Sequence, residues 1–246
     1  LDWQTLPGPV AGTGAYAARF RRADGQWAAA DAAPASGGLA KRHGLQGPVD
    51  AAFMESFLFV RPTGRPSHAD VGAWTEGELR HAVGEWRRQF RGDARVKDDT
   101  AVTDADIAEH NLVLWGDPAA NRLLARIGDR LPIRWDADRV TVGRETYPAA
   151  SHVPVLVYPN PLNPSRYVVL NSGFTFREYD QQNNARQTPK LPDWAVVDIR
   201  TPPDARAPGR VAAAGFFGER WELKDGWKTS ATGAGWTAGD FTPSAR

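Results

Sequence analysis

The chain of 246 residues contains no cysteine and only one methionine. Without cysteine it forms no disulfide, offers no thiolate nucleophile and holds no metal through sulfur. It also lacks any apolar run near the ~20 residues that a membrane-spanning helix needs. The formal net charge is only +1 and the basic residues are scattered, so the charge pattern indicates no nucleic-acid partner. The chain begins Leu1-Asp2-Trp3, with neither an initiator methionine nor a signal peptide. We therefore expect that a leader or a larger N-terminal portion has been removed.

The motifs that usually carry catalysis are also missing. The chain has no G-x-S-x-G nucleophile elbow, no H-E-x-x-H metal motif and no pair of histidines four residues apart. The acidic run from Asp93 to Asp106 lacks the alternating ligands and the central glycine of a calcium loop. A G-x-G-x-x-A match at residues 12–17 follows two prolines rather than a buried strand. The sequence therefore predicts no catalytic residue, no metal site and no cofactor.

The composition that remains is typical of a globular protein with a sizeable core, since 41% of the residues are hydrophobic. Residues 1–50 are rich in Gly, Pro and Ala, and Asp24-Gly25 between two short apolar runs predicts a β-hairpin. We therefore expect a β-rich lead-in segment over residues 1–50 and one α/β domain over residues 51–229. Residues 230–246 are rich in small and polar residues, which predicts a flexible tail.

Two strand–helix units in succession indicate the fold class. Residues 57–60 form an apolar strand, and Thr75 followed by Glu78 matches the capping box of a helix. Residues 112–115 form a second buried strand, and Asp117 is expected to cap the helix after it. Such units favour parallel strands joined by right-handed crossovers. The prediction is an α/β fold with a flavodoxin-like or Rossmann-like sheet and flanking helices, in which strand-to-helix turns are the usual ligand positions.

More strands are predicted in the second half of the chain, where apolar and β-branched residues gather in short runs separated by Asn and Pro. Thr103 is placed to cap a short helix before the second strand–helix unit. The predicted later strands cover residues 139–142, 155–158, 167–170, 194–199 and 211–217.

Two polar loops are unusual enough to be candidate sites. The first is KRHGLQGPVD at residues 41–50, and the second is YPNPLNP at residues 158–164. Short polar groups on proline-stiffened loops lose little entropy when they engage a partner, which favours a ligand rim or a domain interface. A rigid connection without a ligand explains the same residues, and both interpretations stay open. The candidate residues are His43, Gln46, Asp50, Asn160, Asn163 and Asn171.

Five segments of the chain resemble a known class of proteins. They are KRHGLQGPVDAAFMESFLFVRPTG, EWRRQFRGDARVKDDTAVTDADI, NLVLWGDPAAN, VLVYPNPLNPSRYVVLNSGFTFRE and LPDWAVVDI. They resemble the C-terminal region of large multidomain bacterial hydrolases of the prolyl oligopeptidase family or esterase-like α/β-hydrolase kind. The resemblance covers residues 27–221.

The resemblance implies a function that the motifs do not. In such hydrolases the Ser-Asp-His catalytic domain lies upstream of this region, and no triad residue carries over to this chain. The resemblance implies a non-catalytic accessory domain of a secreted or periplasmic serine hydrolase, which packs on the α/β-hydrolase catalytic domain or shapes substrate access. That catalytic domain belongs to the same precursor or to a separate chain.

Two other functions remain open on the sequence alone. Ten tryptophans are consistent with a self-standing module that binds a sugar or a peptide through exposed aromatic rings, although core packing explains them too. The chain is a hydrolase in its own right if Ser172 or Ser151 meets a distant histidine in space. Exposed Trp or Tyr beside the second loop favours the first alternative, and a spatially assembled triad favours the second.

Overall fold

The computed structural model describes residues 3–6, 18–30 and 38–224, and the chain divides into two compact units, Leu1–Gly38 and Leu39–Arg246. In the first unit, β1 (Phe20–Ala23) and β2 (Gln26–Ala29) form an antiparallel hairpin. Asp24 and Gly25 both have positive φ angles, as the tight turn requires. The predicted hairpin is therefore confirmed. The predicted tail over residues 230–246 and the glycine motif at residues 12–17 lie outside the described residues.

The second unit is built on a mixed sheet of seven strands, in the spatial order β12-β11-β9-β10-β5-β3-β4. The strands β4, β3, β5 and β10 run parallel to one another, whereas β9, β11 and β12 alternate in direction beside them. Their bounds are β3 (Phe57–Arg61), β4 (Val96–Asp98), β5 (Asn111–Leu114), β9 (His152–Asn160), β10 (Asn163–Leu170), β11 (Trp194–Asp198) and β12 (Arg210–Gly215).

The prediction of a flavodoxin-like or Rossmann-like sheet with flanking helices is wrong. A doubly wound sheet needs a helix after almost every strand, but no helix joins β9 to β10. Two residues, Pro161 and Leu162, connect these strands, and so short a connection permits only antiparallel pairing. In the described residues strands predominate, and only three α-helices accompany twelve strands. The two predicted strand–helix units are present, but they do not determine how the later strands of the sheet pair.

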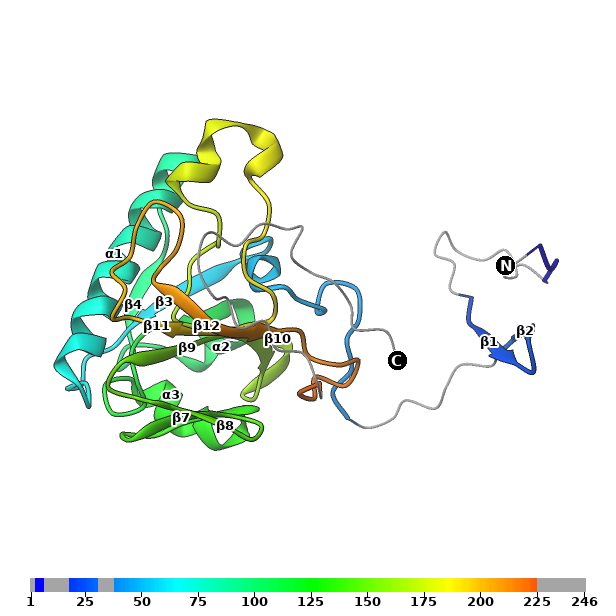
Figure 1. Cartoon of the computed structure of the whole chain (residues 1–246), viewed down its shortest axis with the longest axis horizontal. Coiled ribbons are helices and arrows are strands. Elements are labelled where there is room, and N and C mark those ends of the chain that lie inside the picture. Colours follow the sequence, from blue (N-terminus) through cyan, green and yellow to red (C-terminus); the bar gives the residue numbers. More distant parts are fainter. Residues whose placement is uncertain (1–2, 7–17, 31–37, 225–246) are drawn as a thin grey trace. The chain divides into compact units, whose positions relative to one another are not determined.

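The helices and a small second sheet cover the seven-stranded sheet. Figure 1 shows α1 on one side of it, with α3 and the antiparallel sheet β6-β7-β8 on the other. In the part of the chain that the structure describes, no helix has the length and apolar character to cross a membrane. The remaining bounds are α1 (Ala69–Phe90), α2 (Asp104–Glu109), α3 (Arg122–Ile127), η1 (Val49–Phe53), η2 (Gly128–Arg130), η3 (Glu178–Gln182), η4 (Asn184–Arg186), β6 (Ile133–Trp135), β7 (Arg139–Val142) and β8 (Glu145–Pro148).

The sheet strands are buried on both faces, and their nearly continuous apolar runs follow from this position. On the side of α1, aromatic rings form a connected series in which Phe57 contacts Trp86 at a centroid distance of 4.5 Å and Trp86 contacts Phe90 at 4.4 Å. The series reaches the surface at Phe90, which is 49% exposed, and continues to Phe174 at 5.3 Å. Leu45 and Val49 also lie in the core, so residues 39–50 pack with the large unit.

Helix α1 starts six residues before the predicted capping box. His68 is its N-cap residue, and Thr75 and Glu78 are buried inside the helix. The capping-box pattern at these positions is therefore coincidental, because Glu78 contacts a distant side chain rather than the backbone of Thr75. The helix ends at Phe90, and its C-cap residue Arg91 closes the last turn with a left-handed φ of 60°.

Helix α3 is capped by Asn121 and not by Asp117. The Asn121 side chain accepts the N–H groups of Leu123 and Leu124, which leaves the predicted Asp117 cap without a role in this helix. Instead, the buried Asp117 carboxylate accepts the N–H groups of Ser67 and Ala120 and holds the turn that precedes the helix. The polar side chain of this strand-to-helix turn therefore stabilises the local backbone conformation.

The predicted Thr103 cap of α2 is confirmed. Thr103 and Asp106 form a reciprocal capping box, and Lys97 donates to both carboxylate oxygens of Asp106, at 2.7 and 2.8 Å. Burial acts to raise the pKa of Asp106, but the hydrogen bonds from Lys97 and Thr103 outweigh it and lower the pKa to about 2. The charged carboxylate is therefore the form that the folded chain favours.

We expect the substitution Asp106→Asn to lower the free energy of unfolding by about 1–2 kcal/mol at neutral pH, because the cap and the contact with Lys97 are lost. The folded-state pKa lies below the ordinary value of 3.8, so this stabilisation is present above about pH 4 and disappears as the pH falls toward 2. Urea denaturation from pH 7 to pH 2 measures it. Asp104→Asn in the same helical turn is the control, and an equal effect of both substitutions contradicts the assignment.

Candidate functional site

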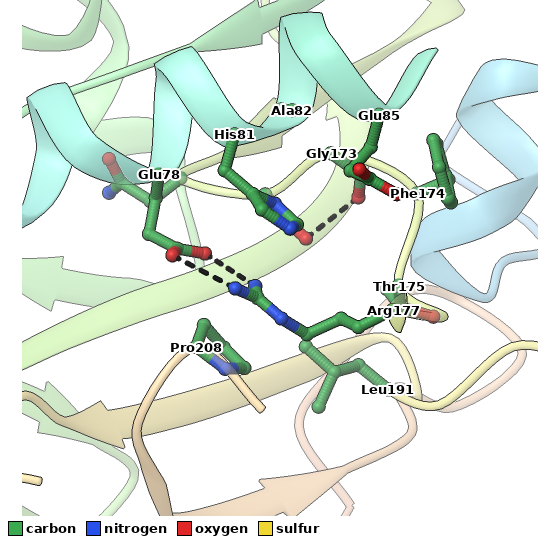
Figure 2. Close-up of a pocket in the computed structure, with 12 residues that line it drawn as sticks. Glu78, His81, Ala82, Glu85, Gly173, Phe174, Thr175, Arg177, Leu191 and Pro208 are labelled. Carbon is green, nitrogen blue, oxygen red and sulfur yellow. Dashed lines mark hydrogen bonds and ion pairs between the residues drawn. The ribbon is translucent and has the colours of Figure 1, made fainter. Parts of the chain in front are cut away.

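A small polar cavity lies between α1 and the segment that follows β10 (Figure 2). Its volume is about 20 Å³, which admits about one water molecule or one ion, whereas organic ligands occupy pockets of about 300–1,000 Å³. Figure 2 shows Glu78, His81 and Glu85 on one face of α1, directed toward the opposing segment. The residues around the cavity are Glu78, His81, Ala82, Glu85, Asn171, Ser172, Gly173, Phe174, Thr175, Arg177, Leu191 and Pro208.

A buried ion pair forms one wall of the cavity. Arg177 donates two hydrogen bonds to the Glu78 carboxylate, at 2.7 and 3.3 Å, and both side chains are less than 10% exposed. Arg177 also donates from Nε to the carbonyl oxygen of Asp204 at 2.9 Å, and its backbone N–H donates to the Asp180 carboxylate. This geometry fixes the start of η3 against α1 over a separation of 99 residues.

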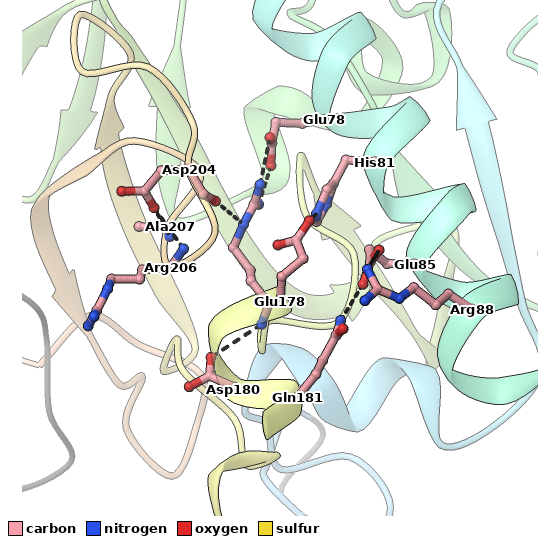
Figure 3. A network of polar contacts seen from close by, with 11 residues as sticks. Glu78, His81, Glu85, Arg88, Glu178, Asp180, Gln181, Asp204, Arg206 and Ala207 are labelled. Atoms are coloured by element: carbon pink, nitrogen blue, oxygen red, sulfur yellow. Dashed lines mark hydrogen bonds and ion pairs between the residues drawn. The ribbon is translucent and has the colours of Figure 1, made fainter. Parts of the chain in front are cut away.

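His81 and Glu85 lie one helical turn apart beside this pair and contact the next residues of η3 (Figure 3). His81 Nε2 lies 3.0 Å from Glu178 Oε1, and Gln181 donates a short hydrogen bond to Glu85. Burial acts to raise the pKa of Glu178, but a hydrogen bond from its own backbone N–H and the charge of His81 lower it overall. The ionised form of Glu178 is therefore favoured beside the His81 imidazole.

The set of His81, Glu85 and Glu178 has the chemistry of a metal site, because one ligand atom from each lies within 4.8 Å of the others. Sequence reasoning missed this set. The available signal is the spacing of His81 and Glu85, four residues apart on one helix, which a pattern of paired histidines does not include. The third member comes from η3, 97 residues beyond His81, which no local pattern reveals.

The structure brings Ser151 next to His152, whose other ring nitrogen faces Asp198. Ser151 Oγ lies 3.1 Å from Nδ1 of His152, but the carbonyl oxygen of Pro148 lies at the same distance from that nitrogen. A carbonyl oxygen only accepts hydrogen bonds, so the contact with Pro148 requires the proton on Nδ1. Nδ1 then cannot take a proton from Ser151. Nε2 of His152 is 4.0 Å from Asp198, too far for a hydrogen bond.

Asp198 is engaged by arginines instead. Arg200 and Arg210 contact its Oδ2 at 2.8 and 2.5 Å. The hydrogen bonds from Arg200 are the largest influence on Asp198 and lower its pKa far below the usual range. Burial lowers the pKa of His152, which favours the neutral ring. The group is therefore a buried structural cluster rather than a proton relay.

The other serines near histidines are no better placed for catalysis. Ser172 Oγ donates to the carbonyl oxygen of Gly173 at 2.8 Å. Ser56 Oγ contacts His110 Nδ1 at 2.8 Å, yet among the described residues no carboxylate contacts the His110 ring to orient it. A nucleophile needs an oriented base, so neither serine is activated by the geometry that the structure describes.

The candidate residues of the first loop have different surroundings. His43 and Gln46 have exposed side chains, and the Gln46 backbone N–H donates to the Tyr167 hydroxyl at 2.7 Å. Asp50 accepts hydrogen bonds from both the N–H and the hydroxyl of Thr175, and burial raises its pKa. Asp50 therefore supports the cavity wall from behind, whereas His43 and Gln46 face solvent.

The candidate asparagines of the later segments make internal hydrogen bonds. Asn160 is fully buried and accepts the Leu162 N–H within the β9–β10 turn. Asn163 donates to the carbonyl oxygen of Ile107 at the end of α2. Asn171 borders the cavity at the other end of β10, about 25 Å from Asn163 by the rise of an extended strand. The structure brings only Asn171, and Asp50 through Thr175, to the cavity.

Asn171 joins three parts of the sheet. Its φ angle is 51°, and its side chain accepts the buried Gly116 N–H at 2.8 Å and donates to the carbonyl oxygen of Pro154 at 3.3 Å. Asparagine tolerates this left-handed conformation better than most residues. The contacts link the ends of β5 and β10 to β9, next to the cavity.

Comparison of the chain with known proteins gave no match to a protein-family model, to a curated protein or to a solved structure.

We expect Glu78→Gln to lower the free energy of unfolding by about 3–5 kcal/mol, because it leaves the buried Arg177 charge uncompensated. The double substitution Glu78→Leu with Arg177→Met removes both charges and is expected to cost much less than Glu78→Gln. Urea denaturation of the variants measures the difference. Glu76→Gln, which breaks the exposed pair of the same helix with Arg80, is the matched control and should change stability by less than about 1 kcal/mol. A Glu78→Gln effect as small as that of Glu76→Gln rules out this role.

Asn171→Ala is expected to destabilise the fold by about 2–4 kcal/mol, because it leaves the Gly116 N–H unpaired and strains a left-handed residue. Asn171→Gly keeps the backbone conformation accessible, so it should cost about 1 kcal/mol less. Thermal and urea unfolding of both variants test this order. Asn184→Ala at an exposed position serves as the control, and the order is refuted if Ala is tolerated as well as Gly at position 171.

Proposed function

We propose that this chain is a non-catalytic accessory domain of a bacterial serine hydrolase of the peptidase or esterase kind, exported to the periplasm or outside the cell. In this proposal the catalytic triad belongs to an α/β-hydrolase domain of the same precursor or of a separate chain. The accessory domain packs on that catalytic domain or shapes the access of substrate to it.

The observation that carries the proposal is that the serine–histidine contacts of the described residues lack the geometry of a catalytic triad. Among the described residues, no serine meets an oriented histidine that is able to accept its proton beside a carboxylate. His152 is held by the Pro148 carbonyl oxygen, and Ser172 donates to Gly173. A chain that resembles part of a serine hydrolase but lacks this assembly fits a supporting role.

The positions of the resembling segments also support the proposal. The five segments supply β3, β4, β5, β9, β10 and β11 and the cavity wall that follows β10. The resemblance therefore concerns the buried sheet of the domain rather than scattered surface loops.

The alternative of a self-standing sugar- or peptide-binding module has less support. That function needs exposed aromatic rings, but the tryptophans of residues 39–224 are buried or half-buried. Beside the second loop, Tyr158 is half-buried and Tyr167 is buried. The observation that favours this alternative is thus not found in the described part of the large unit.

We expect the purified chain to form no covalent adduct with a fluorophosphonate probe, because such probes need a serine activated by a base. Intact-mass spectrometry measures the adduct, and an active serine hydrolase treated in parallel is the positive control. Antibody purification from source cells, followed by the same labelling, should yield a labelled serine outside this 246-residue sequence, on a polypeptide that contains or binds the chain.

Stoichiometric labelling of the purified chain at Ser151, Ser172 or Ser56 overturns the proposal and favours a hydrolase in its own right. The variants Ser151→Ala, Ser172→Ala and Ser56→Ala identify the labelled position. Absence of any labelled hydrolase in the antibody-purified material also counts against an accessory role.

A further inference from the structure

One imidazole and two carboxylates meet beside α1, where His81 and Glu85 also line the small cavity. His81 and Glu85 come from one face of the helix, and Glu178 is the first residue of η3 on the opposite side (Figure 3). One ligand atom from each residue lies within 4.8 Å of the others. Metal–ligand distances of about 2.0–2.2 Å place two ligands at most ~4.3 Å apart, so small side-chain rotations bring all three onto one ion.

The positions of these side chains are fixed by the surrounding structure. The helix sets the spacing of His81 and Glu85, and the adjacent Arg177–Glu78 ion pair anchors Glu178. Gln181 donates a hydrogen bond to Glu85, as groups around metal sites do for ligating carboxylates. The ligands from α1 and the ligand from η3 are therefore both held in position before an ion binds.

A separate observation favours a cation as a partner for Glu178. Glu178 Oε2 is buried and has no hydrogen-bond partner among the described residues, and Gln181 Oε1 is in the same condition. A buried charged oxygen without a partner is unfavourable, and native structures contain few of them. The Glu85 side chain is only 10% exposed, which puts a second carboxylate in the same poorly solvated place. Glu85 already accepts from Gln181 and lies 3.4 Å from Arg88, so a cation chiefly supplies the partner that Glu178 Oε2 lacks.

The size of the cavity and the ligand types narrow the choice of occupant. A volume of about 20 Å³ admits about one ion or one water molecule, but no organic ligand. An imidazole ligand disfavours Mg²⁺ and Ca²⁺, which take oxygen ligands, and suits zinc and its first-row neighbours. Three protein ligands leave the fourth position of a tetrahedral ion for water.

We propose that His81, Glu85 and Glu178 bind one divalent transition-metal ion, with zinc as the best fit. The ion replaces the proton shared by His81 and Glu178 at 3.0 Å, and it ties α1 to η3. This inference is independent of the proposed function, since a metal at this place requires no hydrolase partner.

The test is zinc chloride titration of the full chain after chelator treatment, followed by calorimetry and by metal analysis of the dialysed protein. The expected result is one zinc ion per chain and a higher melting temperature with zinc. His81→Ala and Glu178→Gln should each weaken binding at least about tenfold and abolish the zinc-dependent shift. His43→Ala and Glu109→Gln, at exposed positions outside the cavity, are the matched controls and should bind zinc like the unaltered chain.

His81 and Glu178 are partly exposed, so both variants are expected to fold, and their melting temperatures without metal check this. Failure of zinc to bind overturns the proposal. Equal zinc binding by the variants and the controls overturns it too, because the ion then lies elsewhere. Magnesium binding as tight as zinc binding refutes an imidazole ligand. Labelling by the serine probe does not affect any of these outcomes, so the two proposals fail separately.

Discussion

The buried contact between Glu78 and Arg177 is the interaction on which the candidate site depends. Both side chains are nearly inaccessible, and their desolvation offsets much of their attraction, so the pair adds specificity more than stability. Its specific effect is to set the position of η3 on α1. Because Glu178 follows Arg177 directly, the same contact places a carboxylate opposite His81. One long-range ion pair thus forms a wall of the cavity and positions Glu178 beside His81.

The sheet supplies the rigid frame for this arrangement. β10 lies between the parallel and the antiparallel halves of the sheet, and the segment that forms the cavity wall starts at its end. Asn171 secures that end by bonding to Gly116 and Pro154, and Thr175 is held from behind by Asp50. Asn171 and Asp50, which the sequence suggests as part of a ligand rim, therefore hold the backbone around the cavity in place. They limit the cavity to the size of an ion, which is also why no substrate-sized site forms there.

Much of the strand layout could be predicted from the sequence, because continuous apolar runs such as β5 and β11 reflect burial on both faces. The hairpin turn at Asp24 and the cap at Thr103 were also predictable, since each depends on neighbouring residues only. The start of α1 could not be predicted in this way. Thr75 and Glu78 match a capping box, but Glu78 is bound to Arg177, and a contact across 99 residues leaves no local trace. The prediction of the fold class was wrong for a related reason, because two βα units do not determine how the later strands pair.

The same contrast explains the metal ligands. His81 and Glu85 have the spacing of a helical ligand pair, but this pair is common on helix surfaces and becomes a site only when a third ligand is fixed nearby. That third ligand, Glu178, depends on a tertiary contact that the sequence does not display. Conversely, polar residues on stiff loops, such as Asn160 and Asn163, are conspicuous in sequence but satisfy backbone groups in the fold. In this protein, a polar residue's place in the site follows from the long-range contact that holds it, as the Glu78–Arg177 pair does for Glu178.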